Sequence, residues 1–333
     1  MAVPTNTRET YGAIGIREDL SNIIYNISPM DTPFVNGCGR GTADNTLFEW
    51  QTDELKTAAA NMQKEGDDYA STAATEPRRL SNYTQISATQ VQSSGTAEAV
   101  DFAGRKSTQA YQLAKRAKEM KRDMEFMLLM GTAKVAGSSG TARETAAYST
   151  WIGTNSTSTS PVIAASTGAG LANSGSSTYP DGTTQATTGG ADTAISLAMI
   201  NTCVARIWDL GGSPDTILCK SDVKQTISSS SVGGATVADL YKDVGSSDKP
   251  ATAVNAVDVL VTDFGTFKVV PDRFLPAGNC DIIDFDLWSI DYLRPFRTET
   301  LAKSGDSVKQ LLIAEYGLRA KNGHGSGQIK SAI

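Results

Sequence analysis

The strongest pattern along the chain is an apolar stripe at helical spacing between residue 107 and about residue 134. Charged side chains fill most positions off the stripe, and Ser107 stands before it as a candidate N-cap. The pattern predicts one amphipathic helix, which at ~1.5 Å per residue would span roughly 40 Å, the length of a spine. We expect its methionines to pack in a core rather than to form an adaptable binding face. The stripe comprises Ala110, Leu113, Ala114, Ala117, Met120, Met124, Met127 and Leu128.

A shorter stripe of the same spacing lies near the start of the chain and predicts a helix over residues 16–27. The helix ends before Pro29, because a residue that precedes proline avoids the helical region. An extended segment then leads to Phe34. A short stripe ahead of a globular body cannot bury itself, so it must lie on its own body or on a neighbour. Its apolar positions are Leu20, Ile23, Ile24 and Ile27.

The segment 46–96 has the pattern of a long hairpin. Residues 47–52 and 83–91 are strand-like, and the polar, charged stretch 55–80 between them exceeds the ~12–15 residues of ordinary loops. Nearly every residue of the returning strand is polar on both faces. We therefore expect this strand to protrude toward another chain rather than to pack in the core of the monomer.

The second half of the chain combines a low-complexity segment with a compact unit. Residues 137–190 are rich in Gly, Ser, Thr and Ala, with Trp151 and Tyr179 as anchors, and predict an insertion ordered against neighbouring chains. Residues 191–292 predict an α/β unit, and residues 293–333 predict two strands and a glycine-rich tail. Because helices and strands do not alternate regularly, the fold class is α+β. The expected elements of this half are helices at 192–209 and 221–227 and strands at 216–219, 257–262, 266–270, 280–285, 296–301 and 308–320.

Charge and composition narrow the possible functions. The net charge of −6 argues against a protein that reads nucleic acid, although a mildly acidic wall can enclose nucleic acid without adhering to it. The first residues, 1–5, do not have the pattern of a signal peptide, and no run approaches ~18 apolar residues. We therefore expect a soluble chain that does not span a membrane. Four cysteines without a CxxC pair predict buried thiols rather than a zinc site.

Four features could carry chemistry, and each has a plainer interpretation. His324, the single histidine, lies in a glycine-rich loop and predicts a solvated surface residue rather than a general base. The glycine-rich segment 37–42 lacks the Gly-Lys-Ser/Thr ending of a phosphate loop and predicts a hinge. The carboxylates of Asp281, Asp284, Asp286 and Asp291 predict one wet strand face rather than a cation site. The basic residues of 115–122 alternate with acidic ones, which is typical of a solvated helix face. We expect no catalytic residue, cofactor site or metal ligand, and no enzyme.

Several segments in this order resemble the major head proteins of tailed bacteriophages with the Hong Kong 97-type capsid fold, and within them a podovirus-like family. The similarity is good from about residue 12 to 135 and again near the C-terminus. It implies an N-terminal arm, an extended hairpin loop, a spine helix, a peripheral domain and an axial domain. The segments that carry it are 17–29, 32–34, 49–53, 79–86, 103–105 and 119–125.

The resemblance implies a division of the chain into six parts. These are an arm at 1–45, the extended hairpin loop at 46–96, the peripheral domain with the spine helix at 97–136, the insertion at 137–190, the axial domain at 191–292, and closing strands of the peripheral domain with a tail at 293–333.

The resemblance also implies a function. Hexamers and pentamers of the chain would tile an icosahedral shell around packaged double-stranded DNA, in a virion made in the host bacterial cytoplasm. Expected partners are other copies of the chain, a portal and a separate scaffold protein, with a cement protein as a further candidate. By analogy the hairpin lies over an adjacent subunit and the arm reaches a neighbour. The candidate inter-subunit contacts are Leu20, Ile23, Ile24, Phe34, Trp50, Lys56, Lys64, Arg78, Arg79 and Tyr83.

Two alternatives remain open at this point. The Ser/Thr/Gly-rich segment would suit a surface or fibre adhesin, or another virion protein, although the methionine-striped helix argues for a different architecture. A metal-dependent hydrolase would have to use the aspartates between residues 281 and 291.

Overall fold

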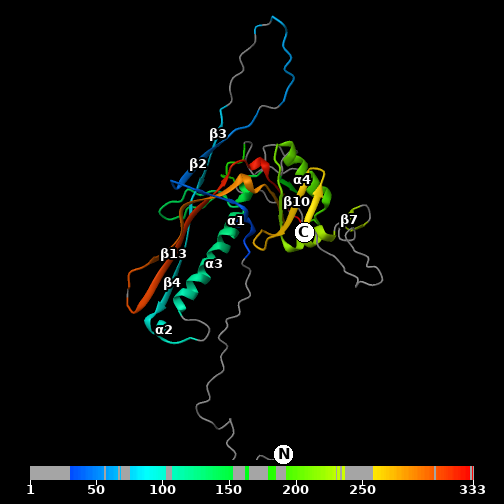
Figure 1. Cartoon of the computed structure of the whole chain (residues 1–333). Helices are drawn as coiled ribbons and strands as arrows, with labels where there is room; N and C mark the ends of the chain where they lie inside the picture. The colour runs from blue at the N-terminus through cyan, green and yellow to red at the C-terminus, as the bar shows by residue number, and fades with distance from the viewer. Residues whose placement is uncertain are drawn as a thin grey trace, which may run out of the picture.

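The molecule is elongated, with a long sheet and helix on one side, a compact unit on the other, and a hairpin loop that projects beyond both (Figure 1). The computed structural model describes residues 31–55, 58–66, 68, 76–102, 107–152, 162–164, 179–184, 193–229, 231–232, 235–236, 258–303, 305–330 and 332. The expected arm helix at 16–27, with Leu20, Ile23 and Ile24, lies outside the described residues, and so does Lys56.

A four-stranded sheet, in the order β1-β12-β13-β4, forms the long side of the molecule. β12 and β13 are antiparallel along most of their length, β13 pairs with β4 over ten residues, and β1 is a parallel edge strand on β12. The strands are β1 (Gly39–Thr42), β4 (Gln85–Ser94), β12 (Trp288–Thr300) and β13 (Ser307–Ala320). The predicted strand at 296–301 is thus the second half of a longer strand, and the predicted hinge at 37–42 is wrong, because most of it is strand β1.

Helix α3 (Thr108–Leu129) packs along this sheet, where Met120 joins Leu312 and Ala314 of β13 in an apolar cluster. Ser107 caps it as predicted, with its hydroxyl accepting a hydrogen bond of 3.2 Å from the Ala110 N–H. The helix ends at Leu129 rather than near 134. Gly131 has a φ of 79°, a left-handed conformation that glycine adopts readily at the C-terminal end of a helix.

The returning strand of the hairpin belongs to the body of the molecule, which makes the prediction that it protrudes wrong. Only β3 (Arg78–Tyr83) pairs with β2 (Leu47–Thr52), and the chain then continues as β4 inside the four-stranded sheet. Two polar residues of β4, Gln85 and Ser93, are buried, whereas the other face of the strand is exposed. Ser93 donates to Gln109 at 2.8 Å, and the Gln109 amide donates to the carbonyl of Val91 at 3.3 Å. Buried polar groups that are hydrogen-bonded in this way are compatible with a core.

A second sheet has six strands in the order β5-β14-β11-β6-β10-β9. Helices α4 (Leu197–Asp209) and α5 (Ser221–Ser229) both contribute to the apolar cluster on one of its faces, where Ile217 and Cys219 point. The other face, with Leu218, packs against the rest of the body. All four cysteines are free and buried, as predicted. The strands are β5 (Val162–Ala164), β6 (Thr216–Cys219), β9 (Val259–Thr262), β10 (Gly265–Pro271), β11 (Asn279–Ile283) and β14 (Gly327–Lys330).

Two parts of the chain that the sequence separated complete this second sheet. β14, from the glycine-rich tail, is fully buried between β5 and β11. β5 comes from the predicted insertion, in which Ala146, Tyr148 and Ile152 are also fully buried in the chain's own core. The expectation that this segment is ordered against neighbouring chains is therefore wrong for its described residues.

The remaining elements are short turns of helix and one small hairpin. They are α1 (Pro33–Gly37), α2 (Gly95–Ala99), the 3-10 turns at Tyr148–Thr150, Phe285–Leu287 and Gly323–Gly325, and the strands β7 (Ser231–Val232) and β8 (Ala235–Thr236).

Candidate interaction surfaces

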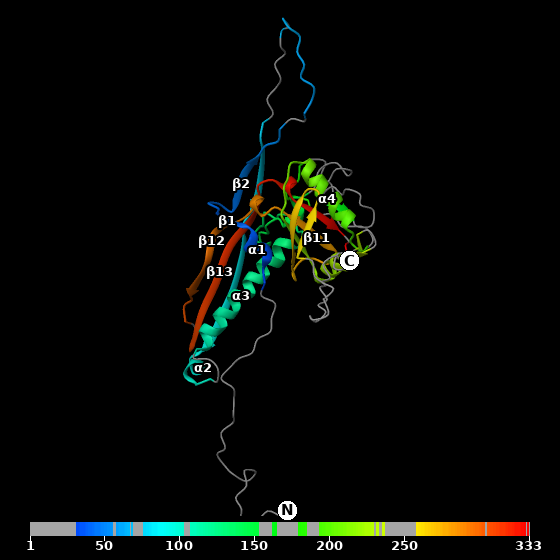
Figure 2. The same cartoon turned by 45° about the vertical axis from the view of Figure 1, so that its right-hand side comes forward.

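The loop between β2 and β3 leaves the body and projects away from it, as the two views in Figures 1 and 2 both show. Its base is fixed by residues on its two sides. Arg78 lies 3.6 Å from the carboxylate of Glu54 across the base, and its guanidinium stands 5.2 Å from the ring centre of Tyr179. The loop beyond the base carries fully exposed apolar side chains, Leu55 and Met62.

His324 supports this base from the body, so the prediction of a solvated surface histidine is wrong. Its side chain is 13% exposed, its Nδ1 lies 3.2 Å from Glu54, and its ring centre is 4.4 Å from that of Tyr179. Burial lowers the pKa of His324, an effect that the carboxylate of Glu54 opposes and Arg78 reinforces. The glycine-rich loop is rigid here because Asn322 accepts hydrogen bonds from the Tyr179 hydroxyl at 2.7 Å and from the His324 N–H at 3.0 Å.

The described contact candidates fall into three groups. Lys64, Arg78 and Arg79 are exposed on the hairpin, where Arg79 pairs with Glu49. Trp50 and Tyr83 are half-buried, and the Trp50 ring lies 5.3 Å from that of Trp151. Phe34 is fully buried, with its ring 5.6 Å from that of Tyr148. Because its side chain is enclosed by its own chain, Phe34 is not an inter-subunit contact in this structure, and that prediction is wrong.

Glu125 holds the segment around Phe34 in place, a role that the sequence did not suggest. It is fully buried and accepts hydrogen bonds from the N–H groups of Phe34 at 2.8 Å and Val35 at 2.7 Å. Burial raises its pKa to about 8, and the neighbouring Asp272 adds to the rise. Its position three residues before Leu128 on the apolar stripe was the signal that could have revealed this.

The outer face of α3 is solvated, as predicted. Arg116 and Lys115 lie 2.7 Å and 3.9 Å from the carboxylate of Glu119, one helical turn away. Exposed pairs of this kind contribute little to stability. The face offers alternating charges rather than a basic patch.

The aspartates near residue 281 do not form one wet strand face, and they do not converge. Asp281 on β11 and Asp291 on β12 are both buried and lie in different sheets. Asp281 accepts a hydrogen bond from Gln328, and burial raises its pKa to about 7, whereas Asp291 pairs with Arg319. Asp284 accepts from the N–H of Asp286 at 3.1 Å in a turn after β11. Within the described ranges, no three His, Cys, Asp or Glu side chains are placed to hold a metal ion.

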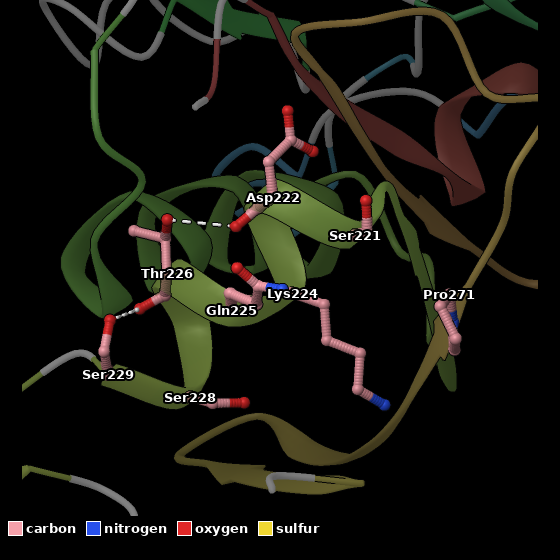
Figure 3. A pocket seen from close by; sticks show the side chains of 8 residues that line it. All are labelled: Ser221, Asp222, Lys224, Gln225, Thr226, Ser228, Ser229 and Pro271. Carbon is pink, nitrogen blue, oxygen red and sulfur yellow. Dashed lines mark hydrogen bonds between the residues drawn. The ribbon is translucent and has the colours of Figure 1, made fainter. Parts of the chain in front are cut away.

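A hollow of about 860 Å³ lies beside α5 and Pro271 (Figure 3). Two of its hydroxyl side chains are engaged within the helix: Thr226 donates to the carbonyl of Asp222 at 3.1 Å and Ser229 to that of Thr226 at 3.0 Å. Lys224 donates to Asp258 at 2.9 Å. These contacts hold three of the lining side chains, Thr226, Ser229 and Lys224, against their own chain.

The fold is that of phage head proteins. It combines helix α3, the four-stranded sheet, the projecting hairpin and the six-stranded sheet, and solved capsid structures share it. The chain is similar to a structure described as the capsid of a native GTA particle, with a TM-score of 0.68 and 12% identity over 97% of this chain and 98% of that one. The capsid protein of cyanophage A-1(L) gives a TM-score of 0.67 and 13% identity over 95% and 97% of the two chains. The fold is the Hong Kong 97-type capsid fold, as expected.

The particular family follows from sequence comparison. The chain belongs to the SU10 major capsid protein family, which matches residues 3–332. A major capsid protein of Escherichia phage Phieco32 is 28% identical over 346 residues, which cover 97% of this chain and 96% of the relative. Membership of this family makes the chain a structural, shell-forming component of a virion, a role that differs from the adhesin alternative. No helix in the described part of the chain is long and apolar enough to cross a bilayer.

Proposed function

We propose that copies of this chain form the hexamers and pentamers of an icosahedral phage head that encloses double-stranded DNA. The observation that carries the proposal is the β2–β3 hairpin loop. It exposes Leu55 completely and Met62 at 88%, and it projects from the body in both views (Figures 1 and 2). Exposed apolar side chains on a projecting loop gain stability only against another chain.

The proposal extends to the partners of the shell. A portal and a separate scaffold protein act during assembly in the host bacterial cytoplasm, a cement protein is a further candidate, and DNA is enclosed without sequence-specific contacts. The net charge of −6 supports enclosure without adhesion. Leu20, Ile23 and Ile24 and the exposed hairpin residues Lys64, Arg78 and Arg79 are the proposed contacts between subunits.

The proposed role is structural rather than enzymatic. The single histidine is enclosed at the hairpin base, and burial raises the pKa of the Cys38, Cys203, Cys219 and Cys280 thiols, which keeps them protonated and weakly nucleophilic.

Electron microscopy of the purified chain tests the proposal. Closed shells or capsomer-sized rings support it, whereas a strictly monomeric protein at high concentration, with or without scaffold protein, contradicts it. The matching variant replaces residues 55–77 by Asn-Gly, which closes β2 and β3 with a short turn. We expect it to keep the circular dichroism spectrum of the parent and to lose assembly. Gln63→Ser, which keeps the loop length, is the control and should still assemble.

A further inference from the structure

Asn36 and Gly37 form an exposed Asn-Gly pair at the C-terminal end of α1. The side-chain oxygen Oδ1 of Asn36 accepts a hydrogen bond of 2.6 Å from the ammonium of Lys121 on α3, a residue 85 positions away in the sequence. A charged donor binds an oxygen more strongly as negative charge develops on that oxygen. The contact therefore prepares the side-chain carbon Cγ of Asn36 for attack by a nucleophile.

The nearest nucleophile along the chain is the backbone nitrogen of Gly37. Glycine has no Cβ to shield this nitrogen, and the packing requires glycine here, because an added Cβ would lie 2.6 Å from the ring of Phe285. Gly37 is also the last residue of α1, and Cys38 after it is extended, with a ψ of 141°. Since the ends of helices fray, the Gly37 nitrogen can turn toward the side chain that precedes it.

The pair Asn322-Gly323 has the same two residues in different surroundings. The N–H of the buried Gly323 donates to the Tyr179 hydroxyl at 3.0 Å, which holds this nitrogen in place. The Oδ1 of Asn322 accepts hydrogen bonds from two neutral donors, the Tyr179 hydroxyl at 2.7 Å and the His324 N–H at 3.0 Å. The structure therefore leaves Asn36 open to reaction and protects Asn322.

We propose that Asn36 is a site of spontaneous deamidation, with the Gly37 nitrogen as nucleophile and the Lys121 ammonium as the group that stabilises the oxyanion. The Gly37 nitrogen loses its proton to hydroxide and bonds to Cγ of Asn36, and the negative charge passes to Oδ1 beside the ammonium. The bond between Cγ and Nδ2 then breaks, Nδ2 takes a proton from water and leaves as ammonia, and a succinimide ring remains. Water opens this ring to aspartate or isoaspartate.

Either product places a carboxylate beside Lys121, and isoaspartate also lengthens the main chain by a methylene group. The change lies between the N–H groups of Phe34 and Val35, which Glu125 holds, and strand β1, which begins at Gly39. Converted chains should therefore fit the body less well at the point where the N-terminal segment joins it. The inference concerns a single chain and does not depend on the proposed function.

Peptide mapping of the purified chain after storage at mildly alkaline pH tests the site. Mass spectrometry detects the exchange of an amide for a carboxyl group at each asparagine, and the peptide with Asn322 is the internal control. We expect Asn36 to convert at least about tenfold faster than Asn322, because only Asn36 combines a charged donor with an accessible nucleophile. Equal rates at the two positions, or an Asn36 that does not convert, overturn the proposal.

Substitutions on α3 test the role of the ammonium. Lys121→Met keeps the length of the side chain but removes the donor, so it should slow the conversion of Asn36 about tenfold. Lys121→Arg restores a charged donor and should keep most of the rate. The matched control is Lys118→Met, which removes the same charge from an exposed position one helical turn earlier and should leave the rate unchanged. A Lys121→Met chain that converts as fast as the parent, or faster, overturns the proposal.

Discussion

The carboxylate of Glu125 accepts a hydrogen bond of 2.8 Å from the backbone N–H of Phe34, so helix α3 holds the point at which the N-terminal segment joins the body. The second carboxylate oxygen of Glu125 accepts from the next N–H, that of Val35. The anchor is buried, and it consists of a titratable group and two main-chain donors. Its strength should therefore depend on pH.

The stability of the protein should fall as the pH rises toward 8, and Glu125→Gln should reduce this fall. The folded protein raises the pKa of Glu125 from 4.5 to about 8, so its contribution is complete below pH 4.5 and is lost as the pH rises through 8. Between pH 6 and 8 we expect the free energy of unfolding of the parent to fall by about 2 kcal/mol relative to the variant. Urea unfolding across this range measures it. Glu119→Gln on the solvated face is the control, and a difference between parent and Glu125→Gln that does not change with pH would contradict the prediction.

Replacing Glu315 should be among the most damaging single changes in the four-stranded sheet. Its buried carboxylate lies 2.6 Å from Arg143 and 2.8 Å from Arg294, and it accepts a hydrogen bond from Thr84. Glu315→Gln leaves two guanidinium groups without their counter-charge, which should cost about 3 kcal/mol of unfolding free energy. The control is Glu299→Gln, which breaks an exposed pair with Arg297 and should change stability by less than about 1 kcal/mol. Equal effects of the two variants in chemical denaturation would show that Glu315 does not have this role.

Gly323→Ala should destabilise the loop that supports the hairpin base. An added Cβ would lie 1.8 Å from the carbonyl oxygen of Trp151, a backbone atom that cannot move aside without distorting the core. We expect a loss of about 3 kcal/mol or more in thermal or urea unfolding. Gly140→Ala is the matched control, because nothing lies within 4 Å of its Cβ and its φ is not positive. A Gly323→Ala protein as stable as the control would mean that the loop shifts freely.

Mild acid should weaken the hairpin base through His324. Its pKa lies below its ordinary value of 6.5 because it is buried, so its contribution is complete above pH 6.5 and is lost as the pH falls below that value. His324→Phe keeps a ring against Tyr179 and removes the titration. The drop in melting temperature between pH 7.5 and 5.5 should therefore be smaller in the variant than in the parent. The same drop in both proteins would assign the acid sensitivity to the carboxylates instead.

Elements whose burial depends on neighbours close in sequence could be predicted. The stripe of α3, helix α4 and strand β6 all have local patterns, and the structure contains each of them. The predicted C-terminal end of α3 was wrong, because the helix stops at Gly131 and the hydrophobic pattern does not change there. Local periodicity therefore identified the elements better than their ends.

Features that depend on distant partners could not be predicted. β4 looks too polar to belong to the body, but its backbone pairs with β13 and its buried Ser93 donates to Gln109. His324 looks solvated until Glu54 and Tyr179 approach it from segments about 270 and 145 residues earlier in the chain. The same holds for Phe34, whose surroundings come from α3 and from the segment that was expected to be an insertion.

The position of β14 in the six-stranded sheet has a consequence for truncated chains. Residues 327–330 lie between β5 and β11 and supply the backbone partners of both. A chain broken off before residue 327 has two open strand edges in the middle of its sheet, where unpaired N–H and C=O groups favour aggregation or degradation. A chain of this kind therefore lacks the strand that joins β5 to β11 and should not reach the folded state from which a shell can be built.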